Sequence, residues 1–122
     1  MSAAARPVRN PFQHVVAEVM RLRGVQGAIV VDAADGIPIA STLDVGVDGD
    51  AVAALAASLF QRAAAATVAA GYGSAAYVQL EGEHGWLCVT GQHGMVLAAV
   101  AEPRTNVALL RLALLRAREH LA

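Results

Sequence analysis

Hydrophobic residues recur at helical spacing in three stretches of this chain. The first, residues 12–20, follows Asn10 and Pro11, a capping residue and a proline that suits the first helical position. The second, residues 50–71, is rich in alanine and apolar on nearly every face. The third, residues 107–121, closes the chain after a Thr-Asn pair that can cap it. The spacing therefore predicts three helices.

Five shorter runs have the β-branched content or the alternation of strands, and turn residues separate them. They are residues 27–32, 37–41, 75–81, 86–90 and 95–101. The first two flank an Asp-Gly turn and predict a hairpin. Pro38 places the second strand at a sheet edge, because proline cannot donate a ladder hydrogen bond. In the third run, Ala76, Val78 and Leu80 alternate with Tyr77 and two polar residues, which predicts one buried face.

The alanine-rich helix is expected to have two different faces. Bulky side chains recur at helical spacing on one of them and are predicted to fill the core: Val52, Leu55, Leu59 and Phe60. The opposite face carries small or uncharged side chains and is predicted to meet a partner: Ala54, Ser58, Gln61 and Ala65. Membrane insertion is not expected, because Gln61 and Arg62 lie in the middle of the stretch and alanine contributes little to insertion.

Composition narrows the class of protein. A length of 122 residues fits one domain, residues 12–122, after a short flexible tail at 1–11. The hydrophobic fraction of 57% exceeds the roughly 45–50% usual for soluble domains, which we interpret as association surface. A net charge of -1 argues against nucleic acid as a partner. A single cysteine and an N-terminus without a signal-type apolar run predict a cytoplasmic protein.

Residues that could carry chemistry have simpler structural interpretations. Cys88 with His84 or His93 is the nearest approach to a nucleophile and base, but Cys88 is predicted to be a buried strand residue and His84 to lie in a turn. The four histidines fall on separate elements, so no metal site is predicted. The aspartates of residues 43–50 are expected to cap the long helix, through Asp48 or Asp50, and not to bind calcium. No catalytic residue and no cofactor are expected.

Three further side chains are candidates for contact with a partner. Arg62 could be an arginine finger, but we expect its side chain to be solvated and to have no catalytic role. In binding, we expect it to make a contact at the rim of the interface. Trp86 is expected in the core, and Tyr77 is the favoured surface anchor. The Gly-Tyr-Gly at 71–73 follows a helix, so it is interpreted as helix termination and not as a phosphate loop.

The order of elements and three segments resemble the roadblock family, which includes dynein light chains and bacterial MglB-type regulators of small Ras-like GTPases. The segments are RGVQGAIVVD at 23–32, DGIPIAS at 35–41 and NVALLR at 106–111. The resemblance implies an α+β, profilin-like fold of order α-β-β-α-β-β-β-α. Its five-stranded antiparallel sheet has the strand order 2-1-5-4-3, with the middle helix on one face and the terminal helices on the other.

The resemblance also implies function. Family members form homodimers in which the third strand pairs with its copy and the middle helices pack side by side. Carried onto this chain, the expected dimer interface is Ala54, Ser58, Gln61, Ala65, Ala75, Tyr77 and Gln79. A small Ras-like GTPase in its GTP form is expected to contact Ser58, Gln61, Arg62 and Ala65. The chain is thus expected to be a non-enzymatic regulator that modulates hydrolysis by its partner, or alternatively a dimeric scaffold or light-chain adaptor that ignores the nucleotide.

Overall fold

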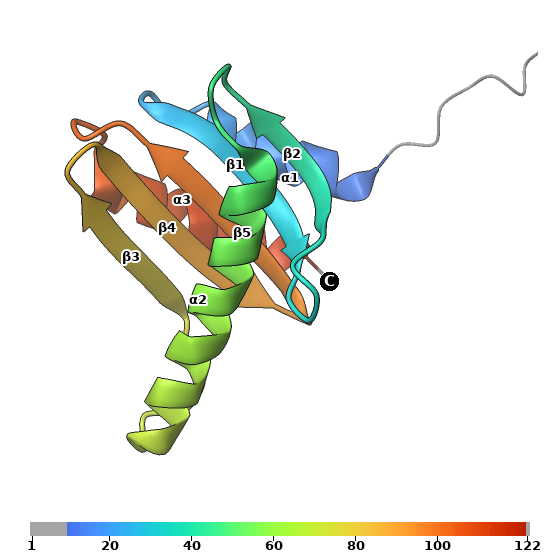
Figure 1. The fold of residues 1–122 in the computed structure, drawn as a ribbon, viewed down its shortest axis with the longest axis vertical. Helices are drawn as coiled ribbons and strands as arrows, with labels where there is room; N and C mark the ends of the chain where they lie inside the picture. Colours follow the sequence, from blue (N-terminus) through green and yellow to red (C-terminus); the bar gives the residue numbers. More distant parts are fainter. Residues whose placement is uncertain (1–9, 122) are drawn as a thin grey trace, which may run out of the picture.

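A computed structural model describes residues 10–121 of the chain, and there it contains three α-helices, five strands and a short 3-10 turn (Figure 1). The elements in chain order are α1 (Pro11–Met20), β1 (Val25–Asp32), β2 (Pro38–Leu43), α2 (Gly49–Ala69), β3 (Tyr77–Gly82), β4 (Gly85–Gln92), β5 (Met95–Ala101), α3 (Val107–Ala117) and η2 (Arg118–His120). This order confirms the predicted succession of helices and strands.

The strands form one antiparallel sheet in the order β2-β1-β5-β4-β3, as predicted. Pro38 opens β2, which lies at one edge, and β3 lies at the other. β3 begins at Tyr77, two residues later than predicted. The carbonyl oxygen of Ala76 accepts hydrogen bonds from Thr90 Oγ1 at 2.7 Å and from Arg118 Nη1 at 3.3 Å. These side chains hold the segment before β3 against β4 and η2.

Each long helix begins at a polar side chain that accepts a hydrogen bond from a free backbone amide. Asn10 caps α1, Asp48 caps α2 and Asn106 caps α3, with N···O distances of 2.9, 3.1 and 3.2 Å. All three belong to the predicted capping sites, and Asp50 lies in the first turn of α2. Residues 1–9 of the predicted tail lie outside the described residues, whereas Asn10 and Pro11 form the start of α1.

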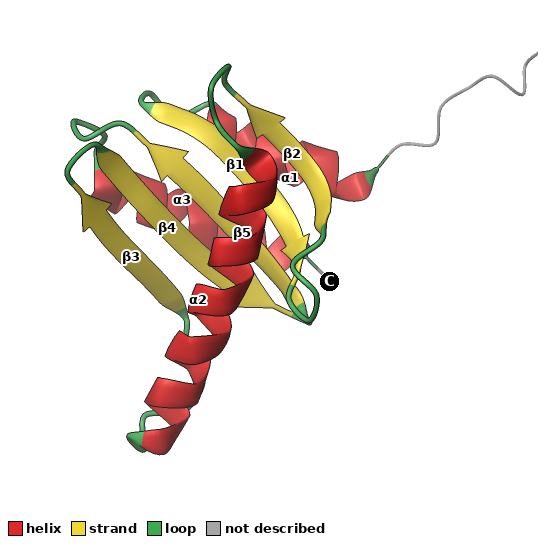
Figure 2. Cartoon of the chain, viewed as in Figure 1, coloured by secondary structure: helices red, strands yellow, loops and turns green. Residues whose placement is uncertain are grey.

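Two hydrophobic cores lie on opposite faces of the sheet. α1 and α3 cover one face with side chains such as Val16 and Leu114, against Val30 and Leu97 from the central strands. α2 crosses the other face, where its buried residues are Ala53, Ala56 and Ala57. Figure 2 shows this helix in front of the sheet and the other two behind it. Helices on both faces were predicted, and the pattern of burial explains why β1 and β5 are almost continuously apolar.

Three residues predicted to be buried are exposed: Leu55, Leu80 and Ala76, which precedes β3. Leu55 is 62% exposed, because α2 approaches the sheet through its alanine face and turns Leu55 away from it. Leu80 is 48% exposed although it pairs with Leu87 and therefore shares the α2 face of the sheet. α2 crosses the sheet obliquely and leaves β3 largely uncovered (Figure 1). The predictions that these three side chains are buried are wrong.

Candidate functional site

The β2 edge of the sheet is protected by α1. Asn10 Nδ2 donates to the carbonyl oxygen of Ile39 at 2.8 Å, and Gln13 Nε2 donates to that of Ser41 at 3.1 Å. Ile39 and Ser41 are two residues apart, so their carbonyl groups point to the same side of the strand. Because Pro38 also lacks an N–H group, β2 offers few free backbone groups to another strand.

The β3 edge has no comparable protection. Within residues 10–121, no side chain forms a hydrogen bond to a backbone group of residues 77–82. Leu80 adds an exposed apolar side chain on the α2 face of this strand. An open edge of this kind can pair with a strand of another chain.

α2 exposes an unusually large apolar surface. By length and composition alone it could cross a membrane, and little of it is buried in this structure. Its second half extends beyond the sheet (Figure 2), and Val68 there is 60% exposed. A helix that is apolar on its outer face needs a second partner besides the sheet beneath it.

One flank of α2 lies against the turn between β1 and β2. A β-carbon on Gly36 would lie 3.5 Å from Cα of Ala54, and the side-chain amide of Gln61 donates a hydrogen bond to the carbonyl oxygen of Ala33. This turn lies on the opposite side of α2 from β3 (Figure 1). Ala54 and Gln61 therefore lie on the flank of α2 away from β3, although both are predicted to share an interface with that strand.

The flank of α2 that faces β3 is bulkier than predicted. Residues three, four or seven apart share a helix face, so Leu59 and Ala66 lie on the flank away from Ala54 and Gln61. Leu55, seven residues before Arg62, lies where that flank meets the outward face of the helix. Between the two flanks lies an outward ridge that faces solvent. The ridge includes Ser58, Arg62 and Ala65, all exposed.

Tyr77 is not a free surface anchor. Its ring packs against the core between the sheet and α3, with the guanidinium carbon of Arg111 5.4 Å from the ring centroid. Its hydroxyl donates to Gln79 Oε1 at 2.9 Å. Burial raises the pKa of Tyr77 far above its usual value, and contact with the Cys88 thiol adds to the shift. The predicted interface residues Tyr77 and Gln79 therefore point to the α3 side of β3, while Ala75 precedes the strand.

The candidate nucleophile is enclosed. Cys88 is fully buried, as predicted, and burial raises the pKa of its thiol. His84 and His93 are exposed residues of the two hairpin turns. Among residues 10–121 no three side chains of His, Cys, Asp and Glu are grouped as metal ligands.

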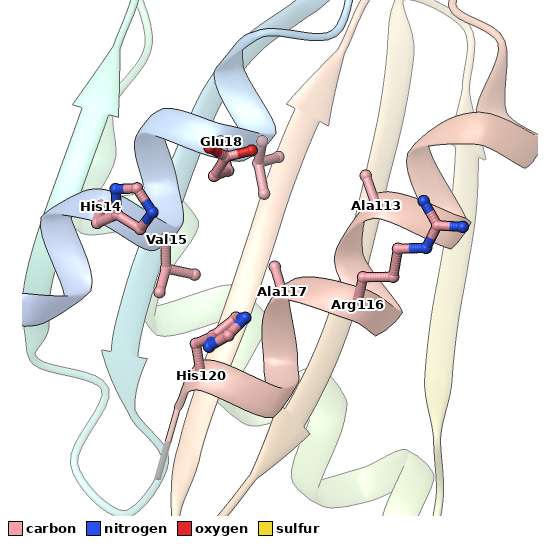
Figure 3. Close-up of a pocket in the computed structure, with 8 residues that line it drawn as sticks. His14, Val15, Glu18, Ala113, Arg116, Ala117 and His120 are labelled. Carbon is pink, nitrogen blue, oxygen red and sulfur yellow. The ribbon is translucent and has the colours of Figure 1, made fainter.

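A groove between α1 and α3 was missed by sequence reasoning. His14 and Glu18 from α1 lie across a cavity of about 270 Å³ from His120 of η2, and Arg116 of α3 also lines it, with its guanidinium group directed along α3 and away from α1 (Figure 3). Val15, Val19, Ala113 and Ala117 form its apolar walls. The two histidines lie at opposite ends of the sequence, and only the packing of the terminal helices on one face of the sheet brings them to the same groove.

Comparison with known proteins gives a family match, curated relatives and similar solved structures. The family model described as the Roadblock/LC7 domain matches residues 11–101. The uncharacterized protein MJ1340 of Methanocaldococcus jannaschii is 31% identical over 108 residues, which cover 88% of this chain and 94% of that protein.

Among solved structures, Myxococcus xanthus MglB has a TM-score of 0.79 at 21% identity, covering 91% of this chain and 84% of that one. A structure described as MglB with tetrameric arrangement has a TM-score of 0.80 at 22% identity, covering 100% of this chain and 95% of that one. At these sequence identities the similarity concerns the fold alone, which this chain shares with both structures.

Proposed function

The chain belongs to the Roadblock/LC7 family, and from that premise we propose that it is a non-enzymatic, homodimeric regulator of a small Ras-like GTPase in the cytoplasm. The observation that carries the proposal is the exposed apolar face of α2 beside an open sheet edge. MglB, whose fold this chain shares, is a member of the group of GTPase regulators that the sequence resembles. The proposal of a GTPase partner goes one step beyond membership of the family.

The homodimer would form through the β3 edge. Antiparallel pairing of two β3 strands satisfies the open backbone groups and joins two sheets about a twofold axis. The two α2 helices then lie on the same side of the joined sheet and approach each other through the flanks that face β3. We assign Leu55, Leu59, Ala66 and Leu80 to this interface, in place of Ala54 and Gln61. The protected β2 edge explains why pairing would use only β3.

The GTPase would bind across the outward ridges of the two α2 helices. Ser58, Arg62 and Ala65 supply a polar and small surface there, while Gln61 is held by the carbonyl group of Ala33. The regulator would bias the switch loops of its partner toward one arrangement, which needs differential affinity for the GTP form. The regulator would supply no catalytic group to the GTPase. The burial of Cys88, its candidate nucleophile, is consistent with this.

The test uses purified Ras-like GTPases from the same organism, loaded with GDP or with a non-hydrolysable GTP analogue. Binding is measured by calorimetry, and hydrolysis is followed in single turnovers. We expect preferential binding of the analogue-loaded form and a changed hydrolysis rate. Arg62→Glu is expected to weaken binding, whereas Arg104→Glu, an exposed arginine on the other face of the sheet, leaves it unchanged.

The same assay separates the alternative function. Equal binding of the GDP and GTP forms, with an unchanged hydrolysis rate, would favour a dimeric scaffold or light-chain adaptor that tethers a larger protein. Absence of binding to every Ras-like GTPase of the organism would overturn the regulator.

A further inference from the structure

Opposite charges lie on separate parts of this molecule. Within residues 10–121, every arginine except Arg62 belongs to α1, α3, η2 or the segments next to them. Three aspartates, Asp44, Asp48 and Asp50, lie together between β2 and the first turn of α2. The described part of the chain, residues 10–121, contains one ion pair, between Arg21 and Glu18 at 3.3 Å. The arginines and aspartates are therefore available to neutralise one another between molecules.

The groove between α1 and α3 is apolar within and cationic or hydrogen-bond donating at its rim. Arg116 supplies a permanent positive charge, and the imidazole groups of His14 and His120 can donate N–H groups to an anion (Figure 3). Glu18 is the acidic residue of the groove, and its carboxylate is already held by Arg21. An occupant that combines an apolar side chain with carboxylates would match this lining.

A second cavity, of about 550 Å³, lies near the other ends of the same two helices. Arg23 follows α1 and Arg104 precedes α3, and both line this cavity beside Leu109. Glu102 also lines it. Arginine side chains therefore lie beside apolar surface at both ends of the helix pair, with one glutamate in each cavity.

The loop before α2 has the complementary chemistry. Val45 is fully exposed. Asp44 precedes it in the sequence, and Asp48 follows at the start of α2. Gly46 adopts a φ of 94°, a left-handed conformation that favours glycine and turns the loop at this point. Residues 44–50 contain no positive charge.

We propose that the groove between α1 and α3 binds the 44–50 loop of a second copy of this chain. Val45 enters the apolar groove, and Asp44 and Asp48 of the incoming loop bind Arg116 and the two imidazole groups at the rim. The contact joins two different surfaces, so it is heterologous and leaves β3 and the α2 ridge free. It therefore builds assemblies larger than the homodimer proposed above.

The test is a charge-reversal cycle on the whole chain, read by sedimentation velocity at low ionic strength over a range of concentrations. Asp44→Arg and Arg116→Glu are each expected to weaken the higher-order association about tenfold or more, because like charges then meet. The double variant is expected to restore it. Both side chains are exposed, so folding should survive, and Glu83→Arg, in the exposed turn between β3 and β4, is the control for reversal of a charge elsewhere.

Val45→Ser gives an independent reading, since it removes the apolar anchor and changes no charge. It should also reduce the association, and added salt should weaken the wild-type assembly. Species larger than the dimer that persist in both single variants would overturn the proposal, as would their absence from the wild type at all concentrations.

Discussion

The ring of Phe60 in α2 rests on Gly91 of β4. A β-carbon on Gly91 would lie 2.8 Å from Cε2 of the ring and 2.9 Å from the carbonyl oxygen of Met95. Neither contact is tolerable, so the absence of a side chain at Gly91 lets α2 lie close to the sheet. We expect Gly91→Ala to lower the free energy of unfolding by roughly 1–3 kcal/mol, measured by chemical denaturation.

A double variant tests the cause. Phe60→Leu in the Gly91→Ala background should recover part of the lost stability, because the shorter side chain relieves the ring contact. Recovery should be incomplete, since the oxygen of Met95 belongs to the backbone and cannot move away freely. A Gly91→Ala variant as stable as the wild type would contradict this account of how α2 is seated.

The β2 edge gives a second prediction. Asn10→Ala removes both the cap of α1 and the hydrogen bond to Ile39, and should cost about 1–2 kcal/mol in the free energy of unfolding. Gln13→Ala removes the bond to Ser41 and should cost less. Both variants should speed hydrogen exchange along β2. His14→Ala, a neighbouring exposed position on α1, is the control, and an equal effect there would count against edge protection.

Much of the fold could be predicted because its signals are local. The caps at Asn10 and Asn106 depend on side chains next to the helices they begin, and Pro38 marks an edge strand by its own chemistry. The order of the strands came from the family resemblance. Gly36 contributes φ 71° at the predicted turn, which is again a local property.

The rest depends on how elements cross. The size of the apolar Leu55 side chain predicts that it is buried. In the structure α2 instead buries Ala53 and Ala56, because small side chains allow a closer approach to the sheet. The direction in which α2 crosses the sheet decides which of its flanks faces β3. The pattern of residues within the helix does not specify that direction. The meeting of His14 and His120 has the same origin, since two distant helices share one face of the sheet.

The placement of the α2 flanks makes a sharp prediction for the proposed homodimer. Leu55→Glu puts a charge where the flank that faces β3 meets the outward face of the helix and should weaken dimerisation about tenfold or more, measured by sedimentation equilibrium. Ala54→Glu, one residue earlier, puts the same charge on the flank beside the β1–β2 turn and should leave dimerisation nearly unchanged. If Ala54→Glu dissociated the dimer and Leu55→Glu did not, the interface would lie on the opposite flank.

The buried Cys88 and the partly buried Tyr77, both on the α3 side of the sheet, predict a loss of stability at alkaline pH. Burial raises the pKa of Cys88, and burial with the Cys88 contact raises that of Tyr77. In the unfolded chain such groups titrate near pKa values of about 8.5 and 10. As the pH rises, the unfolded chain therefore releases these protons before the folded chain does. The free energy of unfolding should be independent of both groups below about pH 8.5 and should fall as the pH rises above it.

Removing either group should flatten this pH profile. Cys88→Ala deletes the thiol at the cost of a small cavity, so the variant is less stable at neutral pH but should lose less with each further pH unit. Tyr77→Phe keeps the ring under Arg111 and removes the hydroxyl, which should flatten the profile above about pH 10. Tyr72→Phe, at an exposed position, is the matched control and should keep the wild-type profile. Urea unfolding across the alkaline range measures all four proteins. A Cys88→Ala profile as steep as that of the wild type would show that the thiol is not the group that couples folding to pH, because the folded and unfolded chains would then hold its proton equally.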